Sequence, residues 1–113
     1  MKNILGFLLF LSLASPLAAR CRTASEAEFK AAALGKTRVV FFASWCKSCE
    51  AHLTPDYAKD SVFVTSYDNA EIADEVLKKF LAAEADHAIC IVDRDERLAM
   101  LYKLKFLPYV VPI

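Results

Sequence analysis

The hydrophobic residues of this chain change their spacing repeatedly, and each change predicts a new element of secondary structure. Short runs rich in Val, Ile and Phe predict strands at residues 37–43, 61–67, 88–92 and 106–111. The run at 88–92 is apolar at every position, which is typical of a parallel strand that is buried on both faces. Helical patterns occupy the intervals between these runs. The alternation predicts an α/β fold with right-handed crossover connections.

The clearest helix follows a capping-box sequence at residues 68–71. Its apolar residues form two rows with a spacing of four: Ile72, Val76 and Phe80, and Ala73, Leu77 and Leu81. The two rows make one broad apolar stripe, which predicts that this side of the helix faces the core. On the polar side, Asp74–Lys78 and Glu75–Lys79 have the spacing of intrahelical ion pairs.

Local end signals predict two shorter helices. A capping box at residues 25–28 begins a helix that is expected to bury Phe29 and Leu34 and to end at Gly35. A polar turn at residues 93–96 leads into the second short helix.

The first 19 residues have the composition of a cleaved secretory signal peptide. Lys2 gives a basic start, residues 4–13 are almost entirely apolar, and residues 16–19 resemble a cleavage region. The apolar run is short for a membrane span, which needs about 20 residues. We therefore expect residues 20–113 to be a single periplasmic or secreted domain. An uncleaved N-terminal membrane anchor is the alternative.

The charge balance excludes classes of protein that need a strong basic field. The chain has 14 basic and 14 acidic residues and a formal net charge of 0. Lys2 is the one charge in the expected signal peptide, so its removal leaves a net charge of −1. Such a chain has no overall basic field to attract nucleic acid or an anionic membrane surface.

The most informative motif is the Trp-Cys-Lys-Ser-Cys sequence at residues 45–49, directly behind the predicted strand at 37–43. A helix is expected to begin near Cys46 and to be kinked or ended by Pro55. The positive end of that helix lowers the pKa of a nearby thiol from about 8.5 to roughly 3.5–7.5. The pattern predicts a dithiol/disulfide redox centre in which Cys46 is the attacking thiolate and Cys49 resolves the mixed disulfide.

A metal site is the main alternative for these cysteines. Cys46, Cys49 and His52 have the spacing of three metal ligands, but no second Cys/His pair completes a tetrahedral set. The remaining candidates for a fourth ligand are Cys21, Cys90 and His87. The sequence therefore predicts redox chemistry with no metal or other cofactor. A copper-binding module and a redox-silent interaction domain are the competing hypotheses.

Two separated motifs together resemble the thioredoxin superfamily. The sequence at 45–49 follows a strand, and Phe-Leu-Pro-Tyr at 106–109 stands where the family has its cis-proline loop. The additional segment at 61–84, followed by residues 91–95, is similar to the exported TlpA-like branch. The resemblance covers residues 24–113. It implies a thioredoxin-like fold, with a mixed or parallel central sheet flanked by helices, and a thiol–disulfide oxidoreductase activity.

The same resemblance implies partners and roles for particular residues. The TlpA-like branch exchanges disulfides with exported proteins, including apocytochromes c, and is recycled by a membrane or periplasmic redox partner. Trp45 is expected to cover the disulfide, with ordinary core packing as the alternative. Pro108 is expected to be cis and to face the cysteines, which leaves the backbone of Leu107 free to pair with a bound peptide.

Lys47 and His52 are weaker candidates for the site. Lys47 adds a cation beside Cys46 that favours the thiolate, or it is a solvated side chain without effect. His52 lies three residues after Cys49, at a position where TlpA-like proteins often have Glu. It either handles the proton of Cys49 near neutral pH or is a surface histidine without a role. The strand before Cys46 contains no acidic residue.

The other two cysteines have no assigned partner in the sequence. Cys90 lies between two isoleucines in the most apolar strand, so an inert core thiol is expected. Cys21 lies close to the expected mature N-terminus, and its pairing with Cys90 or with another chain is left open.

The chain also departs from the family at its end. The family continues past the proline loop into another strand and a final helix, whereas this sequence stops at Ile113. We therefore expect a sheet that lacks that strand and helix and has a bare edge at residues 106–111. The expected consequence is a homodimer through this edge, stabilisation by another partner, or an expanded monomer of low stability.

Overall fold

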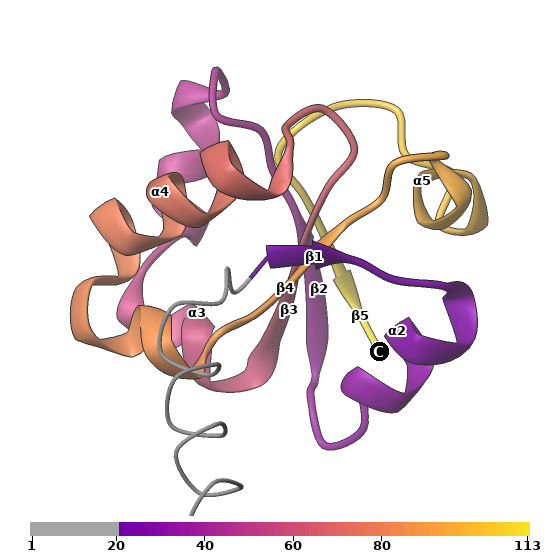
Figure 1. Ribbon diagram of the computed structural model, residues 1–113, viewed down its shortest axis with the longest axis horizontal. Coiled ribbons are helices and arrows are strands. Elements are labelled where there is room, and N and C mark those ends of the chain that lie inside the picture. The colour runs from indigo at the N-terminus through magenta and orange to yellow at the C-terminus, as the bar shows by residue number, and fades with distance from the viewer. Residues whose placement is uncertain (1–20) are drawn as a thin grey trace, which may run out of the picture.

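The computed structural model describes residues 21–113, so the expected signal peptide lies outside the described residues. Within them, no helix is both long and apolar enough to cross a membrane. The chain folds into one mixed sheet flanked by helices (Figure 1), which confirms the predicted α/β class. The elements in order are β1 (Cys21–Thr23), α2 (Glu26–Ala32), β2 (Arg38–Phe41), η1 (Lys47–His52), α3 (Pro55–Asp60), β3 (Ser61–Thr65), α4 (Ala70–Leu81), η2 (Ala82–His87), β4 (Ile89–Val92), α5 (Arg97–Leu101) and β5 (Tyr109–Pro112).

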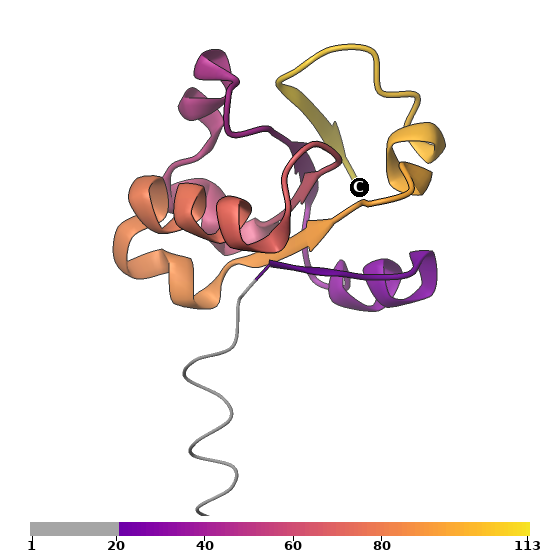
Figure 2. The same ribbon diagram turned by 45° about the horizontal axis from the view of Figure 1, so that its top comes forward.

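The strands of the described residues lie in the order β1-β4-β3-β2-β5. The first four are parallel, and β5 runs antiparallel to β2. In that antiparallel pair, Phe41 at the end of β2 faces Tyr109 at the start of β5. The loop after β2 and the loop before β5 therefore lie side by side at one end of the sheet, as both views show (Figures 1 and 2).

The two faces of the sheet carry separate parts of the core because side chains alternate along each strand. Helices α3 and α4 cover one face, and α2 and α5 cover the other (Figure 1). The side chains toward α3 and α4 include Val40, Phe42, Phe63 and Cys90. Those toward α2 and α5 include Val39, Phe41, Val62, Val64 and Ile91. Cys90 and Ile91 face opposite ways and are each 2% exposed, which confirms that β4 is buried on both faces.

Helix α4 buries a narrower stripe than its sequence predicts. One of the two predicted rows is completely buried, namely Ala73, Leu77 and Leu81. Ile72 in the other row is 41% exposed. The predicted ion pair between Asp74 and Lys78 is present at 3.4 Å, although Asp74 is buried and only Lys78 is exposed. The helix therefore contacts the sheet along the Ala73 row.

One of the two predicted capping boxes is correct. Ser25 Oγ accepts a hydrogen bond from the Glu28 amide at 3.1 Å, and the Glu28 carboxylate accepts one from the Ser25 amide at 2.8 Å. The bond from the Ser25 backbone holds the pKa of Glu28 below its usual value. At the start of α4 the predicted box is wrong, because Asn69 caps the helix by accepting from the Ile72 amide. Asp68 contacts the loop after β2 instead.

The segment between the cysteine motif and β3 differs from the single helix that was predicted. Residues Lys47–His52 form a 3-10 helix, and a separate α-helix begins at Pro55. Proline is well suited to the first turn of a helix because its missing N–H would have no partner there. Pro55 therefore begins a helix here. Leu34, expected in the core, is 80% exposed behind the end of α2.

The two edges of the sheet are short strands. The last strand is Tyr109–Pro112, shorter than the predicted run and shifted toward the C-terminus. At the other edge lies β1, a three-residue strand that the sequence pattern did not reveal. The homodimer expected through the β5 edge remains a prediction.

Candidate active site

The cysteine motif lies at the carboxyl end of β2, as its sequence position predicts. Phe42 and Ala43 continue from β2 into the core, and Cys46 is the residue that precedes η1. Cys46 and Cys49 form a disulfide with a Cα–Cα distance of 5.3 Å. Cys46 is 7% exposed, whereas Cys49 is 0% exposed. Both residues are therefore buried, and of the two only Cys46 keeps any solvent exposure.

Cys46 belongs to the core cluster on the α3 and α4 side of the sheet, and its backbone is hydrogen-bonded through both its amide and its carbonyl. Its amide donates to the Ala43 carbonyl, and its own carbonyl accepts from the Cys49 amide, both at 3.1 Å. Its sulfur lies 3.7 Å from Ser48 Oγ. Lys47 is exposed, and its side chain has no partner within residues 21–113.

Asp68 anchors the loop that leads to Cys46. Its carboxylate accepts hydrogen bonds from the Ser44 amide at 2.7 Å and from the Ser44 hydroxyl at 2.6 Å. The hydroxyl of Thr65, which is completely buried, donates to the same carboxylate at 3.3 Å. Bonds of this length to an ionised acceptor are stronger than bonds between neutral groups. The loop between β3 and α4 therefore supplies an acidic residue that bonds to Ser44, two residues before Cys46.

A second carboxylate ties the neighbouring strands together at the same end of the sheet. Asp93, 3% exposed at the end of β4, accepts from the amides of Leu98 and Ala99 at the start of α5. It also accepts from the hydroxyl of Ser66, which follows β3, at 3.0 Å. Side-chain hydrogen bonds thus join the segments that follow β2, β3 and β4. They hold the cysteine motif in a fixed position relative to the sheet.

We expect the Asp68→Ala substitution to loosen the loop before Cys46. Ser44 and the buried hydroxyl of Thr65 lose their charged acceptor, which costs about 1–3 kcal/mol of unfolding free energy. Urea unfolding measures this loss. Trp45 is the only tryptophan in the chain, so its fluorescence reports the loop directly.

The matched control for Asp68 is Asp95→Ala. The Asp95 carboxylate is 66% exposed and pairs with the exposed Arg97, so its removal is expected to cost under about 1 kcal/mol. Equal stability of the two variants, together with unchanged tryptophan emission, would show that Asp68 does not anchor the loop.

Trp45 is a surface residue. It is 66% exposed, and its ring contacts the ring of Tyr67 edge to face with a centroid distance of 5.4 Å. Ordinary core packing of Trp45 is thus not observed. Tyr67 and Asp68 both come from the β3–α4 loop, and both contact residues just before Cys46. The sequence gives no local signal for either contact, because the partners are more than 20 residues apart.

His52 belongs to a chain of side chains that runs away from the cysteines. Its Nδ1 lies 3.0 Å from Tyr57 Oη, and the guanidinium of Arg38 lies 3.7 Å from the centre of the Tyr57 ring. Arg38 also pairs with Asp60 at 2.8 Å. Partial desolvation would raise the pKa of Asp60, but the hydrogen bond and charge of Arg38 outweigh it, so this pKa is lowered. The proposed proton transfer between His52 and Cys49 remains a prediction.

If His52 handles the proton of Cys49, His52→Ala slows the resolving step and changes its dependence on pH. Stopped-flow measurement of mixed-disulfide decay against pH tests this. His52→Glu should restore much of the rate. Tyr57→Phe is the matched variant, since it removes only the hydroxyl beside Nδ1 and should shift the pH dependence without abolishing it. An unchanged rate of mixed-disulfide decay at every pH in His52→Ala would show that His52 has no role in the resolving step.

The loop before β5 carries the predicted cis-proline. The Leu107–Pro108 peptide bond is cis, as the resemblance implied. Because Tyr109 faces Phe41, Pro108 lies at the same end of the sheet as the cysteine motif. Phe106 in this loop is 64% exposed and contacts the ring of Tyr109 at a centroid distance of 5.7 Å.

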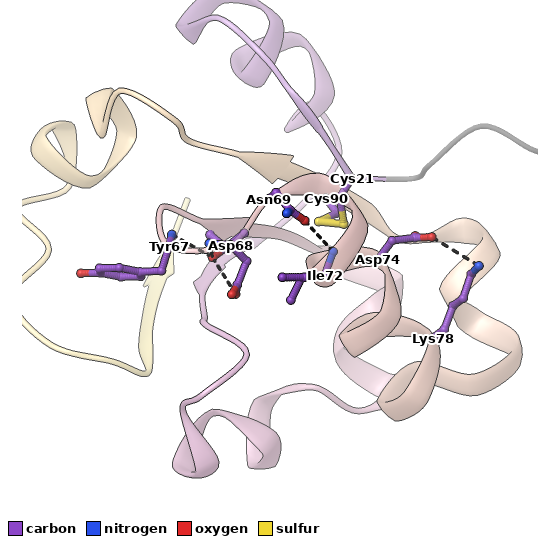
Figure 3. Close-up of a disulfide and its surroundings, with 9 residues drawn as sticks. Cys21, Tyr67, Asp68, Asn69, Ile72, Asp74, Lys78 and Cys90 are labelled. Carbon is purple, nitrogen blue, oxygen red and sulfur yellow. Dashed lines mark hydrogen bonds and ion pairs between the residues drawn. A yellow bond between two sulfur atoms is a disulfide. The ribbon is translucent and has the colours of Figure 1, made fainter.

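The structure corrects the prediction for Cys90. It is not a free core thiol but forms a disulfide with Cys21, its register partner on β1, with a Cα–Cα distance of 4.5 Å. The bond lies beside the first turns of α4 (Figure 3), and both residues are at most 2% exposed. All four cysteines of the chain are therefore paired.

Within residues 21–113, no group of three or more His, Cys, Asp or Glu side chains is arranged to hold a metal ion. Comparisons of the chain with protein-family models, with curated proteins and with solved structures found no match.

Proposed function

We propose that this protein is an exported thiol–disulfide oxidoreductase with a thioredoxin-like fold, similar to the TlpA-like branch. The observation that carries the proposal is the asymmetry of the Cys46–Cys49 disulfide at the end of β2. Both residues are buried, but Cys46 keeps 7% of its surface exposed, whereas Cys49 has none exposed. A redox pair needs this arrangement, because one thiolate must meet the substrate and the other must act only after the mixed disulfide has formed.

The surrounding fold supports the same proposal. The strand β2, which is followed by the Cys-x-x-Cys motif, pairs with the antiparallel strand β5, which begins directly after Pro108. The two loops meet at one end of the sheet, where a substrate peptide would contact both. Exposed aromatic rings of Trp45 and Phe106 lie in these loops and offer apolar contacts to such a peptide.

In the reducing direction, the Cys46 thiolate attacks one sulfur of a substrate disulfide. The substrate bond breaks, its second sulfur leaves as a thiolate that takes a proton from water, and Cys46 is joined to the substrate. The Cys49 thiolate then attacks Cys46, which releases the substrate as a dithiol and forms the Cys46–Cys49 disulfide. Two electrons pass from the pair to the substrate. A membrane or periplasmic dithiol donor must return them.

In the oxidising direction, the same steps run backward from the disulfide seen in the structure. The substrates on either route are exported proteins with paired cysteines, and apocytochromes c are among those expected from the TlpA-like resemblance. The reduction potential decides between the two directions.

A redox titration of the purified protein against glutathione tests the proposal. We expect one reversible two-electron transition with a potential between about −270 and −120 mV, reported by the fluorescence of Trp45. Alkylation and mass spectrometry should assign it to Cys46 and Cys49 while Cys21–Cys90 stays oxidised. Metal analysis of the same sample tests the copper-binding alternative. The absence of a transition, or bound metal on the reduced cysteines, would overturn the proposal.

A further inference from the structure

Ser48 lies between the two cysteines, and its hydroxyl is the polar side-chain group in contact with the reactive sulfur. Its Oγ lies 3.7 Å from Cys46 Sγ, and the side chain is otherwise exposed. The contact is with Cys46 and not with the buried sulfur of Cys49. A disulfide sulfur is a weak acceptor, whereas a thiolate is a strong one, so the contact gains importance when the pair is reduced.

The other expected stabilisers of a Cys46 thiolate are weak in this structure. The predicted α-helix behind Cys46 is a six-residue 3-10 helix, which has fewer aligned peptide dipoles. Lys47 is exposed to solvent, which screens its charge. The hydroxyl of Ser48 is therefore the side-chain group best placed to act on the charge that develops on Cys46.

We propose that Ser48 is a catalytic residue that donates a hydrogen bond to the Cys46 thiolate. This inference rests on the proposed oxidoreductase function and deepens it. A hydrogen bond to the charged form favours that form, so more of Cys46 is thiolate at neutral pH. In the oxidising direction, the same bond makes Cys46 a better leaving group when a second substrate thiolate closes the substrate disulfide and releases it.

The hydrogen bond from Ser48 also shifts the redox equilibrium in one direction. Stabilising the thiolate stabilises the reduced pair relative to the disulfide, which makes the centre more oxidising. Ser48 therefore shifts the equilibrium toward oxidation of substrates, relative to the same chain without the hydroxyl.

The test compares Ser48→Ala with Ser48→Thr in the purified protein, with the Cys21–Cys90 bond verified intact. Ser48→Ala removes the donor, and Ser48→Thr keeps it. Thiolate absorbance near 240 nm, followed against pH, reports ionisation of the reduced pair. We expect ionisation at higher pH in the alanine variant, with attack on a small disulfide at pH 6 slower by about three- to tenfold. For the Ser48→Ala variant, the equilibrium constant for reduction of the Cys46–Cys49 disulfide by glutathione should fall by a similar factor. The threonine variant should resemble the wild type.

Two results would overturn the role of Ser48. One is a Ser48→Ala variant that ionises and reacts like the wild type. The other is a Ser48→Thr variant changed as much as Ser48→Ala, which would show that the hydroxyl is not the cause. Both results can be distinguished from failure of the proposed oxidoreductase function. That function fails only if the wild-type protein itself does not exchange disulfides with glutathione.

Discussion

Replacement of Cys46 by Ser is expected to abolish reduction of a model disulfide, whereas replacement of Cys49 by Ser should leave the first attack intact. The reason is the exposure of the two residues, 7% for Cys46 and 0% for Cys49. A hydroxyl is not ionised at neutral pH and cannot replace the attacking thiolate. In the Cys49→Ser variant, the mixed disulfide on Cys46 has no neighbouring thiol to clear it, so it should accumulate.

Mass spectrometry under non-reducing conditions identifies the mixed disulfide and the cysteine that carries it. The rate of loss of the model disulfide measures activity in both variants. Cys46→Ser/Cys49→Ser is the matched control, because it lacks both sulfurs and should form no adduct. Full activity of Cys46→Ser, or an adduct on Cys49 in that variant, would contradict the assignment of the attacking sulfur.

The features that the sequence predicted well depend on neighbouring residues. The strands at 61–67 and 88–92 follow from short apolar runs, and the row Ala73, Leu77 and Leu81 follows from a spacing of four. The position of Cys46 at a strand end follows in the same way, because an apolar run directly precedes the motif. Local signals also misled, since Leu34 fits a helical stripe but is exposed behind the end of α2.

The features that could not be predicted depend on contacts between distant segments. Asp68 was assigned to a helix cap, but its carboxylate bonds to Ser44, which is 24 residues away. Strand β1 has three residues, too few to show a period. Without that strand nothing brings Cys21 beside Cys90, and four cysteines allow three pairings. The apolar residues beside Cys90 in the sequence therefore predicted its burial correctly, but they did not reveal that it forms a disulfide.

Loss of the Cys21–Cys90 disulfide is expected to destabilise the protein strongly. The bond joins residues that are 69 positions apart, so it greatly restricts the unfolded chain. In the chain-entropy model a loop of this length contributes about 4 kcal/mol. A small domain has a total stability of about 5–15 kcal/mol. The Cys21→Ala/Cys90→Ala variant should therefore unfold at much lower urea concentration, and the edge strand β1 should lose hydrogen-exchange protection first.

The matched control removes the other disulfide with Cys46→Ala/Cys49→Ala. It deletes the same number of sulfur atoms from the same side of the sheet, but its cysteines are only 3 positions apart. The chain-entropy model then gives roughly half the loss, about 2 kcal/mol. Urea unfolding followed by circular dichroism compares the two variants. Equal destabilisation would mean that Cys21–Cys90 acts through local packing rather than by restricting the unfolded chain. A smaller effect for Cys21→Ala/Cys90→Ala than for the control would show that β1 stays docked by its hydrogen bonds and apolar contacts alone.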